Sequence, residues 1–150
     1  LCAAAGCPIL DVDYRRAPEH RYPAALDDAR AALDWSVAHA EALEIDPARI
    51  VLLGDSAGGH VAAGVSQTTP HSVALQVLLY PMTDSAPEAD HSSRRRFGDG
   101  RFFLRESDIT RAEAEYFRPD EDRSVAPASP LRAGAEVFAR QPETWVVTAG

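Results

Sequence analysis

Apolar and polar residues alternate along this chain in a way that is typical of strands separated by helices. Two short runs, 50–53 and 73–80, are apolar at nearly every position, as parallel strands buried on both faces are. Two more runs, 9–13 and 144–149, also read as strands. We therefore predict an α/β fold with a mostly parallel sheet covered by helices.

Helical periodicity occurs between these runs. From Pro23 to Leu43 apolar residues recur every three or four positions, which places them on one face of a helix. Pro23 suits its first turn, and Asp46-Pro47 is predicted to end it. Shorter helices are predicted at residues 1–5, 60–66 and 107–117. Residues 82–130 are rich in charge, Pro and Ser, and form a cap-like or connecting segment.

Composition narrows the class of protein. Hydrophobic residues make up 45% and charged residues 25% of the chain, which is ordinary for a globular domain. The net charge of −8 argues against a nucleic-acid or anionic-membrane partner. The longest apolar run is far shorter than the roughly 20 residues of a membrane helix. All basic residues are Arg, so Schiff-base and phosphate-loop lysines are excluded.

The cysteines and the chain ends give three further expectations. Cys2 and Cys7 are the only thiols, which is typical of a reduced, cytoplasmic protein. No Cys/His cluster offers the ligands of a metal site, so we expect no metal. The chain begins with Leu1 and stops at Gly150 directly after a strand-like run, and we expect a piece of a longer protein, incomplete at both ends.

One motif carries chemistry. Residues 54–58 match G-x-S-x-G between a buried strand and a helix of small residues, which is the context that this motif requires. Side chains at Gly54 or Gly58 are expected to collide with the neighbouring strand or helix. The sharp turn then exposes Ser56 as a nucleophile and directs the amide of Ala57 at a developing oxyanion. The alternative is a glycine-rich turn without catalytic meaning, which the flanking strand and helix disfavour.

Several motifs in order resemble the hormone-sensitive-lipase-like family of α/β-hydrolases, the bacterial family IV esterases. The resemblance covers nearly the whole chain and rests on Asp13-Tyr14-Arg15-Arg16-Ala17-Pro18-Glu19-His20, Tyr22-Pro23-Ala24-Ala25-Leu26-Asp27-Asp28, Trp35, Gly54-Asp55-Ser56-Ala57-Gly58-Gly59, Tyr80-Pro81, Ser129-Pro130-Leu131 and Val146-Val147-Thr148-Ala149-Gly150. Arg16 departs from the family, which usually has an apolar residue there.

The resemblance implies an α/β-hydrolase fold, of which residues 1–150 are a part. It implies hydrolysis of short- to medium-chain carboxylic esters, small molecules, through an acyl-enzyme on Ser56. The oxyanion hole would combine the amide of Ala57 with an upstream His-Gly-Gly-Gly loop, and residues 82–130 would contribute to a cap. No metal or organic cofactor is implied, and the oligomeric state stays open.

The same resemblance implies that parts of the site lie outside this chain. The glycine loop is absent from the sequence, and the triad acid and histidine would follow Gly150. The strand expected between 9–13 and 50–53 is absent too, which would leave backbone groups unpaired at about 1–3 kcal/mol each. We therefore expect residues 1–150 alone to be poorly folded and essentially inactive.

Substitutes for the missing residues are few. His60, His71 and His91 follow Ser56, and each is expected on solvated surface or in a turn, with the His60 ring pointing along its helix. An improvised triad of Ser56, Asp84 and His91 is disfavoured, because only six residues separate the acid from the base.

Other polar and aromatic residues are interpreted as structural. Asp55 is expected to bond turn amides, and the basic run 94–96 to be a solvated face. Asp13 and Glu19 are interpreted as loop residues, and His20 and His39 as ordinary loop and helix residues. The aromatic residues expected to pack inside the cap are Phe97, Phe102, Phe103, Tyr116 and Phe117.

Two rival functions remain. One is a non-catalytic protein on the same fold whose cavity binds a small ligand, since a fold does not dictate function. The retained Ser56 argues against it. The other is a truncated gene product without activity.

Overall fold

Three parallel strands, with helices against them, form the centre of the molecule. This computed structural model describes residues 2–148, and its strands are hydrogen-bonded in the order β1-β2-β3. The strands are β1 Val51–Asp55, β2 Leu75–Leu79 and β3 Glu143–Val147. The helices are α1 Cys2–Ala5, α2 Ala24–Ala38, α3 Ala57–Thr68, α4 Ser92–Phe97, α5 Glu106–Tyr116 and α6 Ala135–Phe138, with 3-10 turns at Pro47–Arg49 and Pro130–Arg132.

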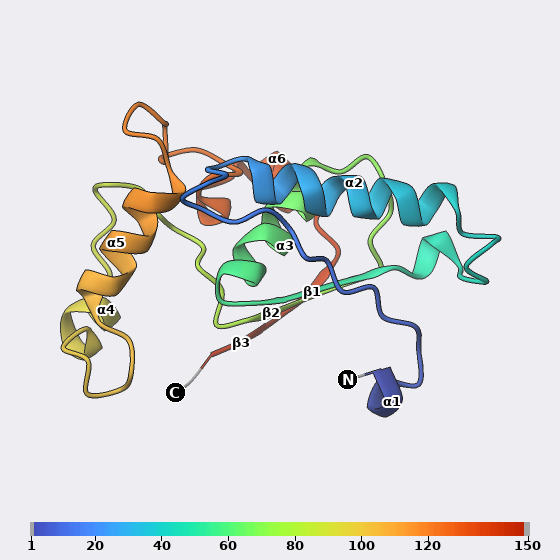
Figure 1. Cartoon of the computed structure of the whole chain (residues 1–150), viewed down its shortest axis with the longest axis horizontal. Coiled ribbons are helices and arrows are strands. Elements are labelled where there is room, and N and C mark those ends of the chain that lie inside the picture. Colours follow the sequence, from blue (N-terminus) through green and yellow to red (C-terminus); the bar gives the residue numbers. More distant parts are fainter. Residues whose placement is uncertain (1, 149–150) are drawn as a thin grey trace.

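Helix α3 lies against one face of the sheet, and α2 packs on α3 on the same side (Figure 1). The core between these elements consists mainly of Tyr22, Ala25, Leu26, Leu33, Val61, Val65, Phe117 and Ala128. On the opposite face Val51 and Leu53 are 48% and 49% exposed, and Trp145 is 56% exposed. Alternate side chains of a strand point to opposite faces. The α/β fold with a parallel sheet is confirmed, but the predicted burial of 50–53 on both faces is wrong within residues 2–148.

The predicted strand 9–13 is not a strand. Ile9 and Leu10 are 44% and 56% exposed, and the segment forms an irregular loop. None of the described strands lies beside this segment. Without a neighbouring strand, its backbone N–H and C=O groups have no ladder of hydrogen bonds to join. The other three predicted strands are present with slightly shifted ends. Leu1 and Ala149, included in the predicted elements 1–5 and 144–149, lie outside the described residues.

The predicted helix that begins at Pro23 is shorter than expected. It ends at Ala38 rather than Leu43, where the His39 ring nitrogen Nδ1 lies 2.8 Å from the carbonyl oxygen of Trp35 and turns follow. The side chain thus contacts a carbonyl at the helix end. Helix α3 is longer than the predicted 60–66, and α5 matches the predicted 107–117 closely. Helix α4 was not expected.

Ion pairs tie the connecting segment 82–130 together and to the rest of the chain. Arg132 Nε donates to Asp84 Oδ1 over 2.7 Å, although 48 positions separate the two residues. Arg94 and Arg123 approach the two carboxylate oxygens of Glu113 at 3.2 and 3.7 Å. The side chain of Arg94 is only 18% exposed, so the prediction that 94–96 is a solvated face is wrong for this residue.

The aromatic residues of the segment divide into two groups. Tyr116 and Phe117 pack against Tyr22 in the main core, with ring centroids 5.8 and 5.2 Å from it. Phe102 and Phe103 are 65% and 96% exposed, so the expected packing inside a cap is wrong for these two.

Candidate active site

Ser56 occupies the turn between β1 and α3 in a backbone conformation that serine rarely adopts. Its φ is 49° and its ψ is −115°. Positive φ in a non-glycine residue is strained, and it persists only when surrounding contacts determine it. Here the amide of Ser56 donates to the carbonyl of Leu79 over 2.9 Å, and its carbonyl accepts from the amides of His60 and Met82, each over 3.2 Å. The side chain is exposed at the carboxyl end of β1.

The glycines of the motif have different roles from those predicted. A Cβ on Gly54 would lie 2.2 Å from the carbonyl oxygen of Gly58, so this position excludes any side chain. A Cβ on Gly58 would meet nothing nearer than Asp55 Oδ1 at 3.9 Å, so the predicted collision there is wrong within residues 2–148. Gly59 carries the second restriction instead, with a Cβ 2.8 Å from Pro81 Cβ.

Ala57 begins helix α3 and is exposed beside Ser56. The first amide groups of a helix have no acceptor inside it and carry the positive end of the helix dipole. This position is compatible with the predicted oxyanion donor, which stays a prediction.

His60 is buried behind the turn, so the expectation of solvated surface is wrong. The residue is 4% exposed, and neither ring nitrogen has a hydrogen-bond partner among the described residues. Its ring meets that of Tyr116 edge-on at 5.6 Å, and the Tyr116 hydroxyl also lacks a partner within residues 2–148. Burial lowers the pKa of His60 from 6.5 to about 4, because a charge cannot be solvated there. A neutral ring packed this way is not placed as a general base.

Asp84 and His91 lie near one another, with 3.6 Å between Asp84 Oδ2 and His91 Nε2. Asp84 is 7% exposed, and its Oδ1 accepts from the amide of Ala86, two residues further along the chain, over 3.2 Å. Burial opposes its ionisation, but hydrogen bonds from Arg132 and the amide of Ala86 outweigh that effect and lower the pKa of Asp84. Within residues 2–148 no hydrogen bond joins either residue to Ser56, so the improvised triad is not assembled.

Asp55 was predicted to accept hydrogen bonds from amides of the turn, and within residues 2–148 it has no such bond. Its Oδ2 accepts from the hydroxyl of Tyr80 over 3.4 Å, and both side chains are exposed. Asp55 therefore ties the ends of β1 and β2 together at the surface, next to Ser56.

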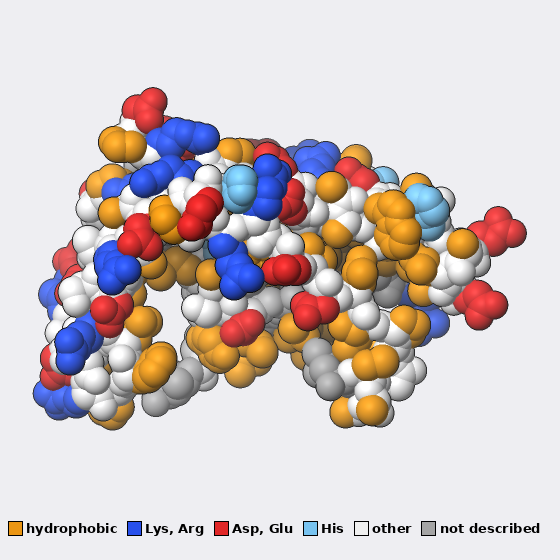
Figure 2. All heavy atoms as spheres, viewed as in Figure 1, with side chains coloured by type: hydrophobic (Ala, Val, Ile, Leu, Met, Phe, Trp, Pro, Cys, Tyr) orange, Lys and Arg blue, Asp and Glu red, His pale blue; other side chains and the backbone are white. Residues whose placement is uncertain are grey.

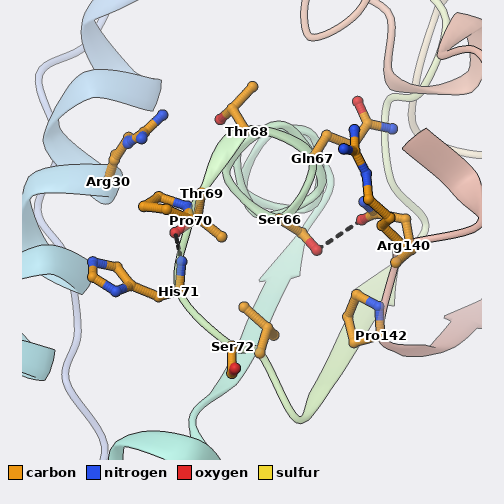
Figure 3. Close-up of a pocket in the computed structure, with 12 residues that line it drawn as sticks. Arg30, Ser66, Gln67, Thr68, Thr69, Pro70, His71, Ser72, Arg140 and Pro142 are labelled. Carbon is orange, nitrogen blue, oxygen red and sulfur yellow. Dashed lines mark hydrogen bonds between the residues drawn. The ribbon is translucent and has the colours of Figure 1, made fainter. Parts of the chain in front are cut away.

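His71 lies before the amino end of β2, at the end of the sheet opposite Ser56. Its Nε2 is 2.8 Å from Asp34 Oδ1, beside a polar cavity of about 560 Å³ between the end of α3 and the start of β2 (Figure 3). Figure 3 also shows the hydrogen bond from Ser66 to Gln141. This cavity lies at the far end of α3 from Ser56, so it is separate from the candidate site.

Two classes of site find no support in the described part of the chain. No group of three or more His, Cys, Asp or Glu side chains within residues 2–148 is arranged to hold a metal ion. No helix described here is long and apolar enough to cross a bilayer.

Two residues near the site are not part of the predicted motifs. The amide of Met82 donates to the carbonyl of Ser56, and Arg132 donates to Asp84, two residues after Met82. Met82 directly follows Tyr80-Pro81, which ends the strand next to the one that leads into the motif. The sequence therefore contained a signal for the position of Met82. The sequence contained no such signal for Arg132, because its partner Asp84 is distant along the chain.

Comparison with known proteins gives consistent matches. The family model described as alpha/beta hydrolase fold matches residues 1–150. The carboxylic ester hydrolase LipN of Mycobacterium tuberculosis is 40% identical over 138 residues, covering 86% of this chain and 35% of LipN. An ethyl acetate hydrolase of Pseudomonas putida is 37% identical, covering 87% of this chain and 42% of that protein. The crystal structure of carboxyl esterase 2 from the fungus Tuber melanosporum matches with a TM-score of 0.87 at 32% identity, covering 97% of this chain and 48% of that one.

The chain thus spans less than half the length of these relatives, while they cover most of it. The match runs through the strand, turn and helix around Ser56, and the role of this serine as a nucleophile stays a prediction. The chain belongs to the α/β-hydrolase fold family, in the hormone-sensitive-lipase-like group that its motifs resemble.

Proposed function

We propose that the whole protein containing this chain hydrolyses short- to medium-chain carboxylic esters through an acyl-enzyme on Ser56. One observation carries the proposal: an exposed serine is held at φ 49° where a strand meets a helix N-terminus. Relatives named as carboxylic ester hydrolase and ethyl acetate hydrolase support the reaction class.

The proposed reaction has two steps. Ser56 Oγ attacks the ester carbonyl, the bond to the alcohol oxygen breaks, and the alcohol leaves with the proton of the serine. Water then attacks the acyl-serine, releasing the carboxylic acid and restoring the hydroxyl. The amide of Ala57 would donate to the oxyanion in both steps. The triad acid and histidine, and the remaining oxyanion donors, are proposed to lie outside residues 1–150.

Ser56→Ala in the whole protein tests the proposal. We expect turnover of p-nitrophenyl butyrate to fall by about 10⁶, the loss measured for the nucleophile of a protease triad. A fluorophosphonate probe should label the unmodified protein and not the variant. Ser72→Ala, an exposed serine at the end of the sheet opposite Ser56, is the matched control and should retain full activity.

Two results would contradict the proposal. Turnover that survives Ser56→Ala would place the nucleophile elsewhere. Ester binding without turnover or labelling would favour a binding protein on the same fold.

A further inference from the structure

A small cavity of about 220 Å³ opens beside the nucleophile turn. It is formed by the segments 81–84 and 91–94. Its wall includes Met82, whose amide donates to the carbonyl of Ser56 over 3.2 Å, so the cavity is next to the residue that would carry the acyl group. Pockets that enclose a whole ligand measure about 300–1,000 Å³. This cavity is therefore sized for one arm of a substrate.

Side chains that can hydrogen-bond, but do not, line this cavity. Within residues 2–148 no protein group is hydrogen-bonded to the hydroxyl of Thr83, which is half-buried, or to that of Ser93, which is exposed to solvent. The nearest polar contact of the His91 ring is Asp84 Oδ2, at 3.6 Å, which is beyond hydrogen-bond distance. Three side chains thus present donors and acceptors to whatever enters.

The charged side chains around the cavity belong to two ion-pair clusters, in which Arg132 pairs with both Asp84 and Glu88 and Glu113 pairs with both Arg94 and Arg123. The guanidinium of Arg94 also lies 3.1 Å from the sulfur of Met82. A cationic group thus covers the most flexible apolar side chain of the wall. Both Asp84 and Arg94 of the lining are thus engaged with residues outside it, and the lining has no continuous apolar surface for an alkyl chain.

Resting on the proposed esterase function, we propose that this cavity receives a neutral, hydroxyl-bearing arm of the ester, through Thr83, His91 and Ser93. A hydroxyl there exchanges water for hydrogen bonds to side chains that are already in place, whereas an alkyl arm leaves those groups without partners. The preferred substrates are then esters of hydroxy acids or of polyols rather than plain alkyl esters.

Matched pairs of esters test this in the whole protein. On the acyl side the pair is p-nitrophenyl butyrate and p-nitrophenyl 3-hydroxybutyrate. On the alcohol side it is propyl butyrate and glycerol monobutyrate. In at least one pair, we expect the kcat/KM of the hydroxylated ester to exceed that of the alkyl ester by about fivefold or more. This factor corresponds to the net free energy of one hydrogen bond. The pair that responds identifies the arm.

Two variants assign the preference to the cavity. Thr83→Val removes one hydroxyl at nearly constant shape, and His91→Leu removes the ring nitrogens of a partly exposed residue. Each should reduce the preference while hydrolysis of the alkyl ester persists. His39→Leu, an exposed histidine stacked on Trp35, is the matched control and should leave the preference intact.

The two proposals fail differently. If no ester is hydrolysed through Ser56, the esterase function itself is wrong. If esters are hydrolysed but neither pair shows a preference, or the preference survives both Thr83→Val and His91→Leu, the cavity proposal is overturned.

Discussion

The turn 54–59 and the connecting segment 82–130 are held in place by different forces. In the turn, backbone atoms are in close contact, so that a Cβ on Gly54 would lie 2.2 Å from the carbonyl oxygen of Gly58. In the segment, charged side chains pair across long sequence separations, as Arg132 does with Asp84. Steric restriction therefore holds the turn at Ser56, and electrostatic pairing holds the connecting segment.

Besides the hydrogen bond from the Met82 amide to the Ser56 carbonyl, a contact of His60, directly after the turn, joins the two regions. His60 belongs to the first turns of α3, directly behind Ser56, and its ring contacts Tyr116 at the end of α5. The contact is apolar in character, since neither ring nitrogen has a hydrogen-bond partner among the described residues.

The largest expected effect separates two glycines of the turn. Gly54→Ala should destabilise the whole protein by more than about 4 kcal/mol, because the new methyl group collides with backbone that cannot move aside. Gly58→Ala, only four positions away, should be neutral or stabilising by up to about 1 kcal/mol, since alanine is the better helix former. Urea unfolding of both variants measures the difference.

Equal destabilisation by the two glycine variants would contradict the steric account of the turn. Gly59→Ala provides a third measurement, and it should resemble Gly54→Ala, because its Cβ would meet Pro81.

The contact between the two regions should weaken in acid. The pKa of His60 is about 4 when folded and 6.5 when exposed, so the unfolded chain binds more protons between these values. This contribution to stability is fully present above pH 6.5 and is lost as the pH falls towards 4, by about 3 kcal/mol in all. The measurement is the free energy of unfolding at a series of pH values.

Replacing the buried imidazole isolates this effect. His60→Phe keeps an aromatic ring beside Tyr116 but cannot be protonated, so the loss of stability between pH 6.5 and 4 should become shallower. His39→Phe, at an exposed position, should leave it unchanged. An identical pH profile for His60→Phe and the unmodified protein would show that His60 is not buried in solution.

The smallest expected effect concerns the charge pairs of the connecting segment. Arg132→Gln should destabilise the protein measurably, because it leaves the Asp84 carboxylate, whose side chain is only 8% exposed, without its closest cationic partner. Arg111→Gln breaks the exposed pair with Glu115 and should leave the stability almost unchanged, since water screens a surface pair. Equal losses in the two variants would remove the distinction between a buried and a surface pair.

The sequence motifs predicted the parts of the fold that depend on neighbours in the chain. The G-x-S-x-G motif located the turn at Ser56, and the apolar runs located three of the strands, because both depend on residues a few positions apart. Segment 9–13 was mispredicted, because a strand also needs a partner beside it. The burial of His60 was missed, because its ring is covered by Tyr116, far along the chain.

The sequence by itself determined that a serine stands between a strand and a helix, flanked by glycines in the pattern of an ester-hydrolysing family. Only the tertiary structure decided that Gly59, and not Gly58, is restricted by its neighbours, and that Asp84 is held by Arg132. The physical reason is that local steric rules depend on adjacent residues, whereas burial and charge pairing depend on which distant segments the fold brings together.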